Sequence, residues 1–128
     1  MKLINKIWRI IALLYVFLII LIITLANSGK LPTQQLSQIP HYDTIGHFIL
    51  YGIAAFLIHR AFQRKMVNIF NYQISLGILL LSIFTIGEEI LQQLIPTRTF
   101  SLVDLGADFL GIFIFFWVGE IKFPPSTQ

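Results

Sequence analysis

The sequence predicts an all-α membrane protein of four transmembrane helices, and composition is the first reason. Of the 128 residues, 56% are hydrophobic and only 12% are charged, with a mean hydropathy of +0.80. Soluble domains carry about 25% charged residues, so this chain has roughly half the charge that a water-exposed surface needs. The chain contains no cysteine, which excludes disulfides, thiolate metal sites and cysteine nucleophiles. Its basic residues are scattered rather than gathered in one patch, so no nucleic-acid partner is expected.

The second reason is the presence of four apolar segments that can cross a bilayer, which takes about 20 helical residues with a range of roughly 17 to 25. These segments cover residues 10–26, 44–62, 72–95 and 102–118. The first segment follows three basic residues, as the core of a signal peptide would, but it is longer than the usual core of about 7 to 15 residues. We therefore expect a retained helix and a single membrane domain over residues 1–128.

The distribution of Lys and Arg predicts the orientation in the membrane. Seven of the nine basic residues belong to one side of the predicted topology, namely Lys2, Lys6, Arg9, Arg60, Arg64, Lys65 and Lys122. The other side holds Lys30 and Arg98. Because basic residues are retained in the cytoplasm, both termini are expected to be cytoplasmic. The connections after the first and third segments are then expected to face outward.

Acidic residues gather at the outward ends of the last three segments. Five of the six are placed there, namely Asp43, Glu88, Glu89, Asp104 and Asp108. With a helical rise of 1.5 Å per residue, Glu89 lies about 9 Å below the outer surface, and Asp108 reaches a similar depth. A charge at membrane depth costs about 2.5–3.5 kcal/mol on insertion scales. Such residues therefore face a protein interior or a watered cavity, which predicts a shared polar layer between these helices.

Spacing within each segment predicts that the polar residues share helix faces. Residues three or four apart lie on one face of a helix. The three sets are Asp43, His47 and Tyr51; Glu88, Glu89 and Gln92; and Asp104, Asp108 and Gly111. The small residues Ala107 and Gly111 should also let two helices approach closely.

In this order and spacing the residues resemble the VanZ-like family of membrane proteins, named after a teicoplanin-resistance protein. The positions that match its pattern are Asp43, His47, Tyr51, Glu89, Gln92, Arg98, Asp104 and Gly111, over about residues 40–120. Thr44 stands where the family has Lys, and Asp108 stands where it has Asn. The resemblance implies a multi-pass protein of the bacterial plasma membrane, linked to the cell envelope and to glycopeptide antibiotics. It implies no defined reaction.

The polar layer fits either a catalytic or a binding site that faces the outside of the membrane. The candidates for general acid–base catalysis are His47, Glu89, Asp104 and Asp108, and the candidates for ligand binding are Asp43, Tyr51, Glu88, Gln92, Arg98 and Ser101. The same nitrogen and oxygen donors suit a divalent cation, although no compact metal motif is present. Arg98 is suited to hold a phosphate or carboxylate of an envelope lipid or cell-wall component.

Other interpretations of the layer stay open. One is a non-catalytic protein that binds an anionic lipid, a glycopeptide or a protein partner. A proton-coupled transporter is less favoured, because ionisable residues should then follow the whole depth of the membrane. Several residues also have structural readings: Asp43 as a helix N-cap, Ser101 with Asp104 as a capping box, Tyr51 as a packed ring with a satisfied hydroxyl, Arg98 as a lipid anchor, and His59, Arg60, Arg64 and Lys65 as inside anchors.

Overall fold

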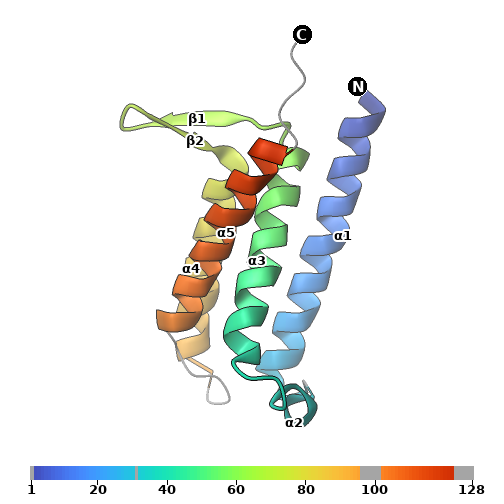
Figure 1. Ribbon diagram of the computed structural model, residues 1–128, viewed down its shortest axis with the longest axis vertical. Helices are drawn as coiled ribbons and strands as arrows, with labels where there is room; N and C mark the ends of the chain where they lie inside the picture. Colours follow the sequence, from blue (N-terminus) through green and yellow to red (C-terminus); the bar gives the residue numbers. More distant parts are fainter. Residues whose placement is uncertain (1, 31, 96–101, 123–128) are drawn as a thin grey trace.

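The computed structural model describes residues 2–30, 32–95 and 102–122, which form a bundle of helices with one hairpin (Figure 1). The elements are α1 (Lys2–Asn27), α2 (Thr33–Leu36), α3 (Tyr42–Ala61), β1 (Met66–Ile69), β2 (Tyr72–Ser75), α4 (Leu76–Gln93) and α5 (Leu102–Lys122). Four of these helices, α1, α3, α4 and α5, are long and apolar enough to cross a membrane. The prediction of four transmembrane helices is therefore confirmed in length and composition.

The hairpin corrects the all-α prediction and the start of the third segment, which was placed at residue 72. Strands β1 and β2 pair antiparallel, with Met66 opposite Ser75. The two turn residues, Phe70 and Asn71, have positive φ angles of 50° and 68°, as a two-residue hairpin turn with the natural strand twist requires. Helix α4 begins only after Ser75, whose hydroxyl accepts a hydrogen bond from the backbone N–H of Ile78 at 3.3 Å and so caps the helix.

Helix α3 is the centre of the bundle and packs against α1, α4 and α5. The core consists of Ile19, Tyr51, Ala54, Ala55, Leu81 and Ile112. The closest approach is between α3 and α5 at Gly111, where a Cβ atom would overlap the backbone carbonyl group of Phe48. The predicted close packing is confirmed at Gly111, and Ala107 one turn earlier is buried; small residues at such a contact are typical of membrane helix pairs.

The bundle has two chemically different ends (Figure 1). Helix α1 begins and α5 ends at the same end of the bundle as the hairpin, which we call the hairpin end, whereas α2 lies at the opposite end, the α2 end. Seven basic residues belong to elements or connections at the hairpin end: Lys2, Lys6, Arg9, Arg60, Arg64, Lys65 and Lys122. The start of α1 and the end of α5 thus lie at the same end of the bundle. The cytoplasmic assignment of that end stays a prediction.

Large apolar side chains cover the outside of the bundle between its two ends. Leu13, Phe17, Ile83, Phe113 and Trp117 are each at least 60% exposed. A soluble domain would bury such side chains, whereas hydrocarbon solvates them as well as a protein core does. The exposed belt therefore supports the membrane assignment independently of helix length.

Candidate functional site

Helices α3, α4 and α5 bring His47, Glu89 and Asp108 together near the α2 end. One ligand atom from each of these side chains lies within 4.8 Å of the others. The three residues are 42 and 19 positions apart in the sequence, so only the packing of the three helices unites them. We call this group the buried triad. The expected convergence of polar residues into one layer is confirmed for these three side chains.

One hydrogen bond, a longer contact with a second carboxylate and a ring contact orient the imidazole of His47. Its Nδ1 atom lies 2.7 Å from Oδ1 of Asp108, and with the carboxylate ionised the ring N–H is the donor. Its Nε2 atom lies 3.7 Å from Oδ1 of Asp43, one helical turn earlier. The ring of Tyr51, one turn later, is stacked on the imidazole with an interplanar angle of 7° and centroids 6.0 Å apart. Asp43, His47 and Tyr51 thus lie on one face of α3, as their spacing predicted.

The carboxyl groups of the buried triad are enclosed by protein, and most of their oxygens lack donors. Glu89 is 1% exposed and Asp108 is fully buried. Among the described residues, neither oxygen of Glu89 and only one oxygen of Asp108 has a hydrogen-bond partner. A buried carboxylate without donors or a counter-charge is strongly disfavoured. The triad therefore requires a proton, a water or a cation among its oxygen atoms.

A second group connects the buried triad to the surface. Asp43, His47 and Asp104 also place ligand atoms within 4.8 Å of one another. Exposure of the side chains falls from 61% at Asp43 to 12% at His47 and 0% at Asp108. The hydroxyl of Thr44 donates a hydrogen bond to Oδ1 of Asp104 at 3.1 Å and so links the ends of α3 and α5. A small polar residue at position 44 thus has a structural use of its own.

Glu88 and Gln92 form a separate, satisfied pair on α4. The side-chain amide of Gln92 donates to both carboxylate oxygens of Glu88, at 2.8 and 2.7 Å. Both side chains are buried. Gln92 therefore pairs with Glu88 and not with Glu89, and the two adjacent glutamates have different surroundings. This difference singles out Glu89 as the glutamate of the candidate site.

Some of the structural roles predicted from the sequence differ from those in the structure. Asp43 is not the N-cap of α3, because the helix begins at Tyr42 and its N-cap is His41. The backbone of His41 is left-handed, and the helix begins two residues earlier than the segment predicted from residue 44. Tyr51 is buried, as expected for a packed ring. Arg98 and Ser101, both predicted as binding residues, lie outside the described residues.

A second polar cluster at the hairpin end was read from the sequence only as a set of anchors. Nδ1 of the buried His59 lies 2.6 Å from Oγ of Ser75, and its Nε2 lies 3.3 Å from a carboxylate oxygen of Glu120. Nε of Arg64 donates to the same oxygen at 3.1 Å. These contacts tie the hairpin and the start of α4 to α3 and α5. Glu120, the one acidic residue at a basic end, was the signal that could have revealed the cluster.

Comparisons of the chain with protein-family models, with curated proteins and with solved structures found no match. The resemblance to the VanZ-like family therefore stays a prediction from motif spacing.

Proposed function

We propose that this multi-pass membrane protein belongs to the cell envelope and that its buried triad binds a divalent cation. Through that cation the site engages a phosphate or carboxylate group of an envelope lipid or cell-wall component. The observation that supports this proposal is the carboxylate of Glu89, which is buried, has no donor among the described residues, and lies within 4.8 Å of ligand atoms of His47 and Asp108.

The donor set and spacing suit a transition-metal ion. One imidazole and two carboxylates match the nitrogen and oxygen ligands of zinc, manganese and iron sites. Ligand atoms about 2.0–2.2 Å from one ion lie within roughly 4.4 Å of each other. The three ligand atoms lie within 4.8 Å of one another, so small side-chain shifts would bring them into this range. Three protein ligands leave a coordination position for the anionic group of a ligand.

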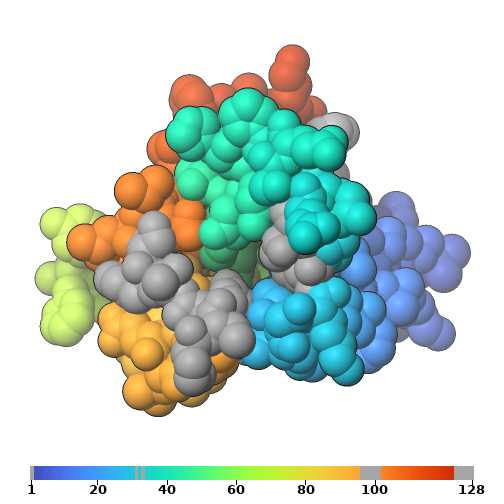
Figure 2. All heavy atoms as spheres, turned by 90° about the horizontal axis from the view of Figure 1, so that it is seen from below, coloured from blue at the N-terminus to red at the C-terminus, as the bar shows by residue number. Residues whose placement is uncertain are grey.

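Access to the site is expected from the α2 end, which Figure 2 shows face on. Asp43 is exposed there, and His47 lies between Asp43 and the fully buried Asp108. The basic residues at the other end support an outward-facing α2 end by the positive-inside rule. Arg98, in the connection between α4 and α5, is then placed in sequence to hold a phosphate or carboxylate by its planar guanidinium.

When no cation is bound, the same side chains can serve in proton transfer instead, because an imidazole nitrogen that ligates a metal cannot carry a proton. His47 has a carboxyl oxygen near each ring nitrogen, namely those of Asp108 and Asp43. An imidazole held between two carboxylates can pass a proton inward or outward, as general acid–base catalysis requires. Such a step would make the protein an enzyme for phosphate-bearing lipids. Cation-dependent binding alone would make it a non-catalytic binding protein.

The transporter interpretation has less support. Between the buried triad and the His59 cluster lie the packed residues Ala54, Ala55, Leu81 and Ile112. Ala54, Ala55 and Ile112 are fully buried. A proton or ion pathway would have to cross this apolar layer, whereas transporters place polar groups or broken helices at the membrane midplane.

Cation binding by the purified protein tests the proposal. Equilibrium dialysis against Mn²⁺ or Zn²⁺ should give one bound ion per chain, and Glu89→Gln should weaken the affinity at least ten-fold. Glu120→Gln is the matched control, because it removes a carboxylate from the His59 cluster and should leave the affinity unchanged. A wild-type protein that binds neither ion, or an equal affinity for Glu89→Gln, would refute the cation site.

Two further measurements test the ligand and the biological role. Polyprenyl phosphate in detergent micelles should bind the wild type in Mn²⁺ and be released by a chelator, and conversion of that lipid would identify an enzyme. The resemblance to the VanZ-like family adds the expectation that cells without the protein change their tolerance of teicoplanin. An unchanged tolerance would remove the glycopeptide link and leave the cation test unaffected.

A further inference from the structure

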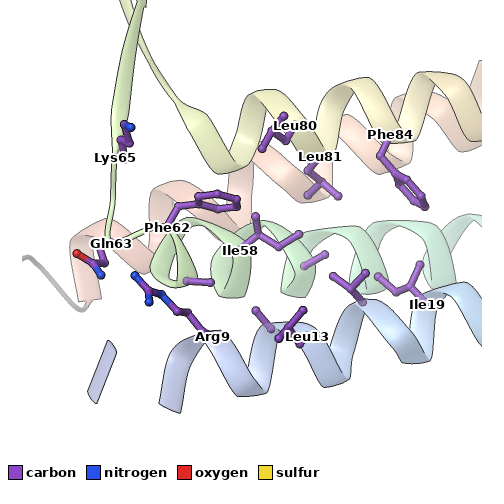
Figure 3. Close-up of a pocket in the computed structure, with 14 residues that line it drawn as sticks. Arg9, Leu13, Ile19, Ile58, Phe62, Gln63, Lys65, Leu80, Leu81 and Phe84 are labelled. Atoms are coloured by element: carbon purple, nitrogen blue, oxygen red, sulfur yellow. The ribbon is translucent and has the colours of Figure 1, made fainter. Parts of the chain in front are cut away.

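A groove of about 700 Å³ runs along the bundle between α1 and α4, with α3 as its floor (Figure 3). The residues that line it include Leu13 of α1, Ile58 of α3 and Leu80 of α4. All of the lining residues are apolar except Arg9, Gln63 and Lys65. The groove lies away from the buried triad, which is formed by α3, α4 and α5 at the other end. It is therefore independent of the proposed cation site.

The three polar lining residues are grouped at one end of the groove. Figure 3 shows Arg9, Gln63 and Lys65 together at the hairpin end, and Ile19 and Phe84 at the far end. Arg9 and Lys65 are exposed, and neither forms an ion pair with a described residue. No acidic side chain lines the groove within the described ranges. An apolar groove with two cationic side chains at one end, Arg9 and Lys65, is complementary to an anionic amphiphile.

The length of the groove identifies the kind of amphiphile. From Arg9 to Ile19 the helix rises about 15 Å, at 1.5 Å per residue. This is half of the roughly 30 Å hydrocarbon thickness of a bilayer. The groove therefore extends from the membrane surface to the midplane, which is the length of one leaflet. A partner transmembrane helix would need a groove along the whole thickness, whereas the acyl chain of a lipid fills one leaflet.

We propose that this groove binds one anionic phospholipid of the leaflet at the hairpin end. Its acyl chain lies between α1 and α4, and its phosphate is held by Arg9 and Lys65. Anionic lipids are enriched in the cytoplasmic leaflet, and basic pockets between transmembrane helices bind their headgroups. The basic residues at the hairpin end predict that this end faces the same, cytoplasmic, leaflet.

The bound lipid completes the attachment of α1 to the bundle. The direct contacts of α1 with α3 include the hydroxyl of Tyr15, which donates to the backbone carbonyl of Leu50 at 2.7 Å, and the ring of Trp8 against Phe56. Of the residues in the most apolar stretch of α1, only 11% are buried in the bundle. A lipid in the groove would contact α1 and α4 at the same time and bridge them.

Native mass spectrometry of the detergent-purified protein tests the proposal with phosphatidylglycerol and phosphatidylcholine as probes. The wild type should retain one phosphatidylglycerol per chain at least ten-fold more strongly than phosphatidylcholine. The double variant Arg9→Gln with Lys65→Gln should lose this preference. Lys2→Gln with Lys122→Gln removes the same charge at the same end, outside the groove, and should keep it. Equal losses in the two double variants would reduce the effect to general electrostatic attraction and overturn the proposal.

A second variant tests the apolar part of the groove. Val16→Trp places a large ring among the lining residues and should reduce the retention of phosphatidylglycerol at least ten-fold, although Arg9 and Lys65 remain. Leu14 is 66% exposed and does not line the groove, so Leu14→Trp is the matched control and should bind as the wild type. Full retention in Val16→Trp would refute the groove as the binding site. A wild-type dimer that forms in place of the lipid complex would assign the groove to a second copy of the chain.

Discussion

Replacing Glu89 with Gln should change the stability of the protein in opposite directions with and without a cation. The carboxylate of Glu89 is 1% exposed and has no donor among the described residues. A buried polar group without a partner costs about 1–3 kcal/mol, and a charged group costs more. Without a cation, Glu89→Gln should therefore raise the free energy of unfolding by at most about 1–3 kcal/mol, because the amide stays a buried polar group but carries no charge.

A bound cation should reverse this order. A ligand that binds only the folded state stabilises it by about 2.7 kcal/mol at 100 times its Kd and by about 4.1 kcal/mol at 1,000 times its Kd. At the higher concentration, the stabilisation of the wild type by the cation exceeds the stabilisation that Glu89→Gln gives without a cation. The wild type should then be the more stable protein, and the variant should respond little to the cation.

The assay is unfolding by sodium dodecyl sulfate in mixed micelles, in a chelator and in a Mn²⁺ or Zn²⁺ series. Glu88→Gln is the matched control, because Glu88 is buried on the same helix but is hydrogen-bonded to Gln92. It should keep the cation response of the wild type. A loss of stability for Glu89→Gln in chelator, together with no cation response of the wild type, would show that Glu89 is a structural residue.

Three other predictions address topology, packing and the mouth of the site. A cysteine introduced at Gln35 should react with an impermeant thiol reagent on intact cells and one at Lys65 should not; the reverse pattern would place the site in the cytoplasm. Gly111→Ala should lower the free energy of unfolding by about 1–3 kcal/mol because its Cβ meets the α3 backbone, whereas Gly106→Ala, with open space around it, should not; equal effects would refute the close approach. Arg98→Ala should weaken binding of a phosphate-bearing lipid with little change in thermal stability, as expected of a residue that binds a ligand; a large loss of stability would make Arg98 structural.

The helices and the polar layer were predictable because both depend on local periodicity. A hydrophobic run of about 20 residues predicts a membrane helix whatever its neighbours are. The rise and turn of a helix then set the depth and face of each side chain. For this reason the common layer of His47, Glu89 and Asp108 could be predicted from three separate segments. The close approach at Gly111 follows from the same reasoning, since small residues on one face allow helix contact.

The hairpin was not predictable by the same reasoning. Its strands are only four residues long and mix apolar with polar residues, so periodicity alone does not distinguish them from the first turn of a helix. The turn residues Phe70 and Asn71 also lack the Asn-Gly or Asp-Gly signal of a two-residue turn. The contact of Ser75 with His59 holds the end of the hairpin against α3, and a contact between residues sixteen positions apart is not visible in a local pattern.

The sequence by itself determined that this is a membrane bundle with its acidic residues concentrated at one end. Only the tertiary structure decided which polar groups have partners. Glu88 and Glu89 are neighbours of the same type, yet one is bonded to Gln92 and the other faces His47 and Asp108. The groove between α1 and α4 likewise could not be predicted from any one segment, because three helices line it. Local periodicity sets where side chains point, but partners and cavities arise only when helices from distant parts of the chain pack together.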